Sequence, residues 1–199
     1  RPILYDIKSL KLKPLIPRTR TFEISERMRY DGSVESAIEL EDVDRAVRNI
    51  SDDDEVAVAI CFLHSYANPT HEIEAKRLCE NLRPDLFVCS SHEVLSQFRE
   101  YERFSTTALN AILGPLMSQY FSHLKANLDG RGYRRDIYIM TSNGGVSTVE
   151  RAKELPISTV LSGPAGGVAA AVYLGKRHNL PNLITCDMGG TSTDVCLVE

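Results

Sequence analysis

An uninterrupted apolar run is the feature of this sequence that most constrains its fold. Residues 56–63 are Val-Ala-Val-Ala-Ile-Cys-Phe-Leu, which is typical of a strand buried on both faces of a parallel sheet. Asn68 and Pro69 then predict a helix N-cap followed by proline at the first helical position, with the helix ending near Leu82. A second short apolar strand follows at residues 86–90. This strand–helix–strand order predicts an α/β fold.

Composition and charge narrow the class of protein. Of the 199 residues, 43% are hydrophobic and 25% are charged, as in one large or two small globular domains. The net charge is −4 and basic residues form no continuous stretch, so no nucleic-acid partner is expected. No apolar run approaches the roughly 18 residues of a membrane helix, so we expect no membrane contact and a cytoplasmic location.

The spacing of the cysteines and histidines predicts no metal site built from these two residue types. The five cysteines lack paired metal-binding spacing and mostly lie in apolar runs, so buried free thiols explain them. His64 and His71 are seven residues apart, and no third ligand follows at a useful spacing. We therefore expect structural or surface histidines.

Prolines, glycines and turn residues divide the sequence into three segments. Residues 1–30 are expected to be irregular and strand-like, with a strand between Arg20 and Arg29. Residues 31–135 begin with a turn at Asp31-Gly32-Ser33 and form an α/β segment with a long helix. Residues 136–199 form the third segment. Because the sequence lacks an initiating methionine, we expect it to be a piece of a longer polypeptide.

Apolar periodicity predicts two helices in the middle segment. The first contains Val43, Val47 and Ile50 and ends at the aspartates of residues 52–54. The second runs from about residue 99 to residue 128, and Gly114-Pro115 should kink or divide it. Apolar residues at three- and four-residue steps form a stripe on this helix: Leu109, Leu113, Leu116, Tyr120, Leu124 and Leu128.

The third segment contains two glycine-rich loops. A strand at residues 136–141 ends at Ser142-Asn143-Gly144-Gly145, a flexible loop expected at the carboxyl edge of the sheet, where α/β proteins bind ligands. After a short helix near residues 148–154, residues 157–161 lead into Ser162–Gly167 and then a helix of small residues, 168–174, expected to pack on the sheet. The donors of this second loop and the helix dipole suit an anion. The alternative is a tight strand-to-helix turn whose small residues serve packing.

The end of the sequence predicts a phosphate-binding hairpin. An apolar strand from residue 183 reaches Asp187, whose carboxylate can hold a metal ion or a water. The glycines that follow allow φ > 0 and close approach of an anion, and hydroxyls add donors: Gly189, Gly190, Thr191 and Thr193. The alternative is a simple β-turn in which Asp194 caps backbone amides, although such a turn does not require this combination of residues.

A charged segment lies at the start of the long helix. Residues 99–103 are Arg-Glu-Tyr-Glu-Arg, which could belong to an active site. Charges at helical spacing are more typical of a solvated or salt-bridged face, and we prefer that interpretation. No Ser/His/Asp or Cys/His signature is present, which disfavours a metal-free nucleophilic hydrolase.

Five ordered motifs give the sequence a resemblance to a known family. They are residues 63–69, residues 99–107, residues 142–145, residues 161–167 and residues 187–195. On these motifs the sequence resembles the hydantoinase A and oxoprolinase family, relatives of acetone and acetophenone carboxylase subunits, nearly from end to end.

The resemblance implies a ribonuclease-H-like, actin-like ATPase fold of the sugar-kinase and heat-shock chaperone type, with a mixed sheet and flanking helices. Two lobes of such a fold close on a nucleotide, and each offers a phosphate hairpin. Residues 1–30 would then belong to a preceding domain. Residues 136–199 would begin the second lobe and stop before its hairpin closes.

The resemblance also implies an activity. ATP would phosphorylate the carbonyl oxygen of a cyclic amide before water opens the ring, with Mg²⁺ as second cofactor and Asp187 as catalytic and metal-binding residue. A hydantoinase B-type subunit or domain is the implied partner. The implied cofactor-binding residues are Gly189, Gly190, Thr191, Thr193, Asp194, Ser162, Gly163, Gly166, Gly167, Asn143, Gly144 and Gly145.

Two alternative functions share these motifs. An ATP-dependent ketone carboxylase subunit would also activate a carbonyl oxygen by phosphorylation. A non-catalytic ATPase-fold module would serve assembly instead, with residues 99–103 or 8–20 facing a partner. For each of these functions, including the cyclic-amide reaction, we expect the isolated chain to be inactive and to bind ATP·Mg weakly or not at all.

Overall fold

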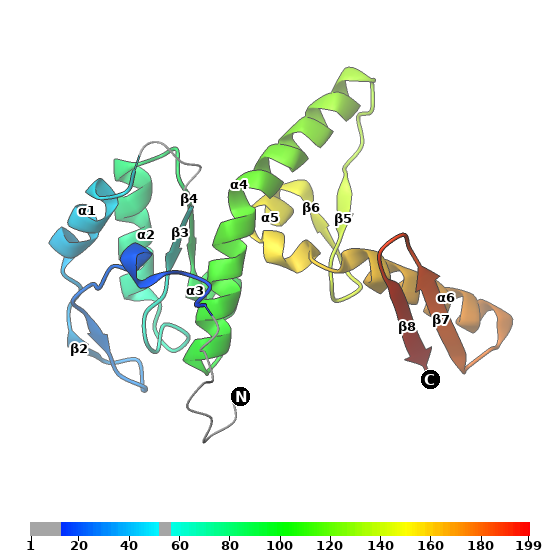
Figure 1. The fold of residues 1–199 in the computed structure, drawn as a ribbon, viewed down its shortest axis with the longest axis horizontal. Helices are drawn as coiled ribbons and strands as arrows, with labels where there is room; N and C mark the ends of the chain where they lie inside the picture. Colours follow the sequence, from blue (N-terminus) through cyan, green and yellow to red (C-terminus); the bar gives the residue numbers. More distant parts are fainter. Residues whose placement is uncertain (1–12, 52–56) are drawn as a thin grey trace. The chain divides into compact units, whose positions relative to one another are not determined.

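The fold comprises two compact units in a computed structural model that describes residues 13–51 and 57–199 (Figure 1). The units are Arg1–Ala111 and Ile112–Glu199, so their boundary lies within the long helix. Both units combine helices with strands, which confirms the mixed α/β class. The predictions made for residues 1–12, for Val56 and for aspartates 52–54 lie outside the described residues.

The first unit begins with a short 3-10 helix and a hairpin. These elements are η1 (Arg18–Arg20), β1 (Arg27–Met28) and β2 (Val34–Ser36), and β1 pairs antiparallel with β2. The turn predicted at residues 31–33 is confirmed, because Gly32 has φ 82° and the Arg29 amide donates to Ser33 O at 2.9 Å. The strand predicted over residues 20–29 was too long, since β2, its pairing partner, is itself short.

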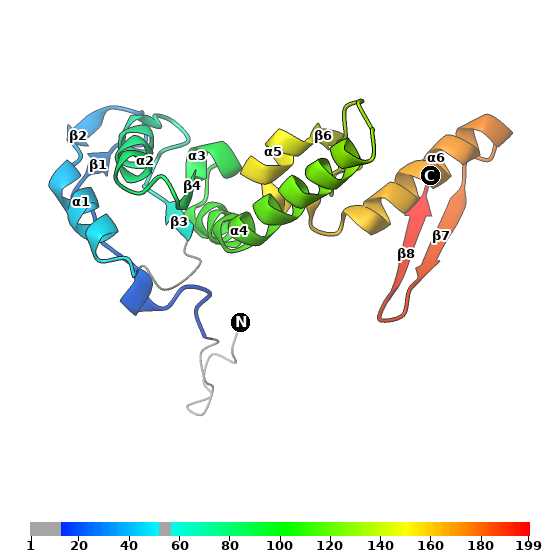
Figure 2. The ribbon, with the colours of Figure 1, turned by 90° about the horizontal axis from the view of Figure 1, so that it is seen from above.

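A strand–helix–strand unit forms the rest of this core, as predicted. Strands β3 (Ala57–Ile60) and β4 (Phe87–Ser90) pair in parallel, and α2 (Thr70–Leu82) joins them. Helix α1 (Leu40–Arg48) lies beside α2 (Figure 2). The two helices and two strands enclose one core: Val43, Val47, Ile60, Ala75, Cys79 and Val88.

Strand β3 is shorter and less buried than predicted. Residues 61–63 leave the strand because the Phe62 amide donates to the carboxylate of Glu72 at 2.9 Å instead of to a neighbouring strand. Ala59 is exposed, so the strand is not buried on both faces within the described residues. The α2 cap also differs by one position. The helix starts at Thr70, whose amide and hydroxyl donate to Asn68 Oδ1 at 3.1 and 2.6 Å.

A buried carboxylate organises the carboxyl ends of β3 and β4. Glu72 is fully buried and accepts hydrogen bonds from the Phe62 amide, the Ser91 hydroxyl, and both the amide and Nδ1 of His92, at 2.5–2.9 Å. Arg103, also fully buried, donates to Phe62 O at 2.8 Å. Both backbone polar groups of Phe62 are therefore held by buried side chains, which fixes the chain where it leaves β3.

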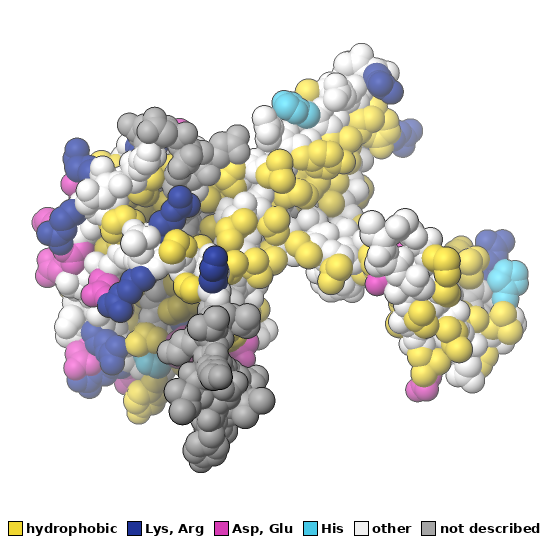
Figure 3. All heavy atoms as spheres, viewed as in Figure 1, with side chains coloured by type: hydrophobic (Ala, Val, Ile, Leu, Met, Phe, Trp, Pro, Cys, Tyr) yellow, Lys and Arg dark blue, Asp and Glu magenta, His cyan; other side chains and the backbone are white. Residues whose placement is uncertain are grey.

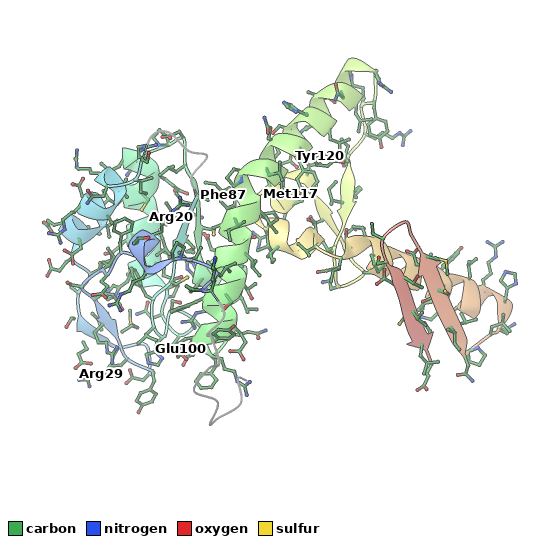
Figure 4. The ribbon with its side chains drawn as sticks, in the orientation of Figure 1. Arg20, Arg29, Phe87, Glu100, Met117 and Tyr120 are labelled. Atoms are coloured by element: carbon green, nitrogen blue, oxygen red, sulfur yellow. The ribbon has the colours of Figure 1, made fainter. Side chains whose placement is uncertain are left out.

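The long helix α4 (Glu100–Gly130) is continuous through Pro115, so the proline does not divide it. Much of its predicted apolar stripe is exposed, and Figure 3 shows hydrophobic side chains gathered along α4. Met117 and Tyr120 both project from this helix (Figure 4), but Met117 packs against the core of the second unit whereas Tyr120 is 56% exposed. The buried face carries smaller residues and one ring: Ala108, Ala111 and Phe121.

In the second unit, a hairpin and a short helix follow α4 and pack against its second half. Strands β5 (Tyr138–Met140) and β6 (Val146–Thr148) pair antiparallel. Helix α5 (Val149–Glu154) follows as predicted, and Thr148 caps it by accepting from the Arg151 amide. Phe121, Val149 and Ala152 form the core of this part.

The remainder of the second unit corrects one prediction. Residues 157–161 do not extend a strand; η2 (Pro156–Thr159) occupies that stretch, with proline at its first turn. Helix α6 (Ser162–His178) then begins at once, so the predicted loop Ser162–Gly167 forms the first turns of a helix. Pro164 is compatible with a first helical turn, and Gly166 packs against Met140 of β5. Among the described residues, no helix has the length and hydropathy of a membrane span.

We expect Glu72→Ala to destabilise the chain by about 3 kcal/mol, because buried donors lose their acceptor. Urea unfolding followed by circular dichroism measures this change. Glu74→Ala is the matched control, because Glu74 is exposed on the same helix and its loss should cost less than about 0.5 kcal/mol. Equal unfolding midpoints for the two variants would contradict the organising role of Glu72.

The cysteines should differ in how fast a thiol reagent modifies them. Burial raises the pKa of Cys61 to about 12 and the pKa values of Cys79 and Cys89 to about 11, whereas Cys186 is exposed. Because the thiolate is the reactive form, a pKa raised by two leaves about a hundredfold less of it at pH 8. A maleimide at pH 8, mapped by mass spectrometry, should modify Cys186 first and these three only in denaturant. Early modification of Cys89 would refute this expectation.

Candidate functional site

The hairpin at the end of the chain brings two carboxylates together. Strands β7 (Leu183–Met188) and β8 (Thr193–Val198) pair antiparallel over their full length. The hairpin is therefore closed, contrary to the expectation that the chain stops before it closes. Its register places Asp187 directly opposite Asp194, and both residues are exposed. Residues directly opposite on antiparallel strands project from the same face, so the two carboxylates lie side by side.

Strand alternation gives the hairpin two different faces. Asp187 and Asp194 share a face with Leu183, which contacts α6: a Cβ added to Gly175 would lie 2.7 Å from Leu183 Cδ1. Helix α6 and the hairpin thus lie side by side (Figures 1 and 2). The opposite face is exposed and mostly apolar, with Ile184, Met188, Val195 and Leu197, and it also carries the predicted ligand residue Thr193 opposite Met188. The carboxylates therefore occupy the turn end of the face that packs on α6.

A backbone hydrogen bond closes the turn between the two strands. The Gly189 amide donates to Ser192 O at 2.9 Å, and neither Gly189 nor Gly190 uses the left-handed φ that glycine allows. A Cβ on Gly190 would meet nothing within 4 Å. Packing within the described residues therefore does not require glycine at residue 190, and the space above its backbone is open to a ligand.

The electrostatics of the hairpin favour a cation. Like charges directly opposite one another in a sheet repel, and neither Asp187 nor Asp194 has a basic partner among the described ion pairs. Two carboxylates are suitable ligands for a hard cation such as Mg²⁺. In the described part of the chain no group of three or more His, Cys, Asp or Glu side chains is placed to hold a metal. The remaining ligands would therefore be water and ligand oxygens.

Residues 142–145 form a tight turn between β5 and β6 instead of a flexible loop. Asn143 Oδ1 accepts from the Thr141 hydroxyl at 2.6 Å and from the Gly145 amide at 2.9 Å. The Gly144 amide donates to Thr141 O at 3.0 Å, and Gly144 has φ 81°. The three predicted ligand residues of this motif, Asn143, Gly144 and Gly145, thus use these groups to close the turn.

The start of α6 divides the predicted residues of the Ser162–Gly167 motif. Ser162 and Gly163 lie in the first turn, where amides have no helical acceptor, and no side chain caps them. Gly166 and Gly167 lie one turn further, where helix geometry directs their amides to carbonyls of the preceding turn. Only the first pair can donate to an anion.

Two of the three motifs meet in the second unit. The Ser142 amide donates to Ser158 O at 2.7 Å, and Met140 packs against Gly166, so the 142–145 turn lies near the start of α6. The described hydrogen bonds do not connect the Gly189–Ser192 turn to either motif. Ser192 was not among the predicted ligands, yet its hydroxyl lies 3.5 Å from Asp194 Oδ2. Its position between Thr191 and Thr193, in a run of three hydroxyl residues, was the signal that could have identified it.

Two family profiles match this chain. The profile described as Hydantoinase/oxoprolinase N-terminal region matches residues 1–82, and the profile described as Hydantoinase/oxoprolinase matches residues 103–199. Together they account for most of the sequence and for four of the five motifs in full.

Characterised relatives match over nearly the whole chain. The caprolactamase subunit alpha of Pseudomonas jessenii is 36% identical over 193 residues, which are 97% of this chain and 28% of that subunit. The acetophenone carboxylase gamma subunit of Aromatoleum aromaticum is 31% identical over 194 residues, covering 93% of this chain and 26% of the relative. The chain thus spans about a quarter of the length of these relatives.

Solved structures agree with this assignment. The crystal structure of ATP-dependent caprolactamase from Pseudomonas jessenii superposes with a TM-score of 0.84 over 97% of this chain and 28% of that one. The nucleotide-free acetone carboxylase structure is 31% identical and gives 0.81 over 94% of this chain and 26% of that one. By sequence and by fold, the chain belongs to the hydantoinase/oxoprolinase family.

Proposed function

We propose that this chain provides one phosphate-binding lobe of an ATP-dependent enzyme that phosphorylates the carbonyl oxygen of a cyclic amide before water opens the ring. The observation that carries the proposal is the β7–β8 register, which sets Asp187 opposite Asp194 beside an open Gly-Gly turn. A caprolactamase relative supports it, because caprolactam is a cyclic amide. The lobe would belong to the actin-like, ribonuclease-H-like ATPase fold.

The hairpin residues suit ATP with Mg²⁺. Asp187 and Asp194 would hold the ion, which would supply charge neutralisation for the phosphates. The Gly190 amide and the Thr191 hydroxyl would donate to phosphate oxygens. The two other predicted donors do not fit this role, because the Gly189 amide donates to Ser192 O and Thr193, opposite Met188, lies on the other face of the hairpin. Phosphoryl transfer depends mainly on positioning and on stabilising charge, and these groups can do both.

A second set of donors would come from the start of α6. Ser162 and Gly163 offer uncapped amides at the positive end of the helix dipole, and no acidic residue lies in that turn. The role proposed for Asn143, Gly144 and Gly145 is indirect: the turn they close is tied to the segment before α6 by the Ser142–Ser158 hydrogen bond. This turn would hold the helix start in place.

The enzyme would act in the cytoplasm and with a partner. Relatives are named as alpha and gamma subunits, so assemblies of several subunits occur in the family. We propose a subunit or domain of hydantoinase B type as the partner of this chain.

A ketone carboxylase is the second candidate, supported by the superposition on acetone carboxylase. Turnover assays of the full-length enzyme with cyclic amides and with ketones plus bicarbonate would separate the two reactions. Turnover of ketones alone would reject the cyclic-amide proposal. ATP-independent assembly with no turnover of either class would favour a non-catalytic assembly module.

Asp187→Asn should lower ATP-dependent turnover of a cyclic amide by about a hundredfold or more in the full-length enzyme, because a charge that serves the ion is lost. The melting temperature should stay equal or rise, since repulsion with Asp194 is relieved. Asp136→Asn is the control, an exposed aspartate of the same unit outside the site. Unchanged turnover in Asp187→Asn would refute the catalytic role.

Gly190→Ala tests the approach of phosphate to the turn. Its Cβ would meet nothing within 4 Å, so folding should be unaffected, but the methyl group would occupy the space of an anion. We expect about tenfold weaker ATP·Mg binding by calorimetry on the full-length enzyme. Gly130→Ala is the control, because its Cβ is equally unobstructed and lies at the end of α4. Identical affinities would show that phosphate does not contact this turn.

A further inference from the structure

Two motifs that the proposed function does not use converge at the start of α4 in the first unit. Residues 63–69 follow β3, and residues 99–103 open α4, which begins at Glu100 (Figure 4). Tyr66 of the first motif contacts Phe98, just before the second, with ring centroids 6.1 Å apart in an edge-to-face arrangement. Arg103 of the second motif stacks on Tyr66, 5.4 Å from the ring centroid.

Tyr66 and the buried Arg103 together hold the exposed side chain of Phe98 in one position. Arg103 is fully buried and anchored by hydrogen bonds to Phe62 O and Gln97 O, at 2.8 and 3.0 Å. Its guanidinium supports Tyr66, and Tyr66 supports Phe98. The Phe98 ring is therefore preorganised even though 69% of the residue is exposed.

The surrounding surface has the composition of a protein interface. We define the α4-start surface as Phe98, Arg99, Tyr101 and Glu102. Tyr101 is 82% exposed, and Arg99 and Glu102 form a loose ion pair at 3.7 Å beside it. Exposed aromatic side chains with arginine are the anchors most enriched in protein–protein contacts, and rim charges provide orientation.

Backbone geometry supports a role beyond packing. Arg99 has φ 90°, a left-handed value that is strained for a residue with a side chain. Strain of about 1–3 kcal/mol persists where the surroundings impose it. The left-handed Arg99 lies between Phe98 and Tyr101 in the sequence, and both of these aromatic residues are exposed.

We propose that the α4-start surface is the docking site for the second subunit, a protein surface with an apolar pocket for Phe98 and Tyr101 and charged groups that face Arg99 and Glu102. The inference rests on the hydantoinase B-type partner of the proposed function. The subunit names of the relatives support a protein occupant. Beneath the surface, two guanidinium nitrogens of Arg103 donate to backbone carbonyls, whereas its Nε is buried without a hydrogen-bond partner among the described residues.

The test uses the full-length chain and its purified hydantoinase B-type subunit. Phe98→Ala/Tyr101→Ala should weaken their affinity at least about tenfold by calorimetry, because interface anchors of this kind dominate binding. Tyr173→Ala, an exposed tyrosine on α6, is the matched control and should change affinity less than about twofold. Circular dichroism verifies that each variant folds, which is expected because all three side chains are exposed.

Calorimetry with ATP·Mg on the same samples separates the two proposals. Retained ATP binding together with lost partner affinity in the double variant supports the docking surface. Unchanged partner affinity in the double variant, or no binding of the subunit by the unmodified chain, overturns it. Partner binding that depends on this surface in a chain that does not bind ATP would support the docking site and reject the ATPase proposal.

Discussion

A slip of one residue in the pairing of β7 with β8 would move Asp187 to the opposite face from Asp194. The cation site that we propose depends on this register. Leu183, whose side chain packs at Gly175 of α6, sets which face turns to the helix. Because side chains alternate, the same contact that buries Leu183 also sets Asp187 and Asp194 on one face. A packing contact at one end of the hairpin thereby determines the chemistry at the other.

The first unit uses buried charge for a similar purpose. Glu72 accepts from the Phe62 amide and Arg103 donates to the Phe62 carbonyl, where the chain leaves β3. This is the sheet edge at which α/β proteins bind ligands, yet its polar groups bind each other. Burial of charged groups is weak support for stability, but it specifies one arrangement of the chain. The buried Arg103 and the Tyr66 ring that it contacts therefore hold Phe98 from the inner side. The surface that we propose for partner binding lies on the exposed side of Phe98.

Sequence patterns predicted α1 and α4 from apolar residues at helical spacing, and α2 from its cap residues Asn68 and Pro69. They failed at residues 61–63, where a hydrogen bond to Glu72 ends a strand that hydrophobicity alone would extend. They failed again at Ser162–Gly167, because glycine content favours a loop and only the contact of Gly166 with Met140 explains a closely packed helix. The proposed site residues Asp187 and Asp194 were singled out from the local sequence motif. Their pairing required the register, and the left-handed Arg99 has no sequence pattern at all.

Carboxylates in this chain separate into two classes by what their oxygens contact. Glu72 accepts four hydrogen bonds and is fully buried, so a ligand could reach it only by breaking the fold. Asp187 and Asp194 face each other on the surface without a basic partner among the described residues. Binding a cation there would remove a repulsion and break no contact of the core. The difference in satisfied hydrogen bonds, more than the residue type, is the reason that the cation site is proposed at the hairpin and not at Glu72.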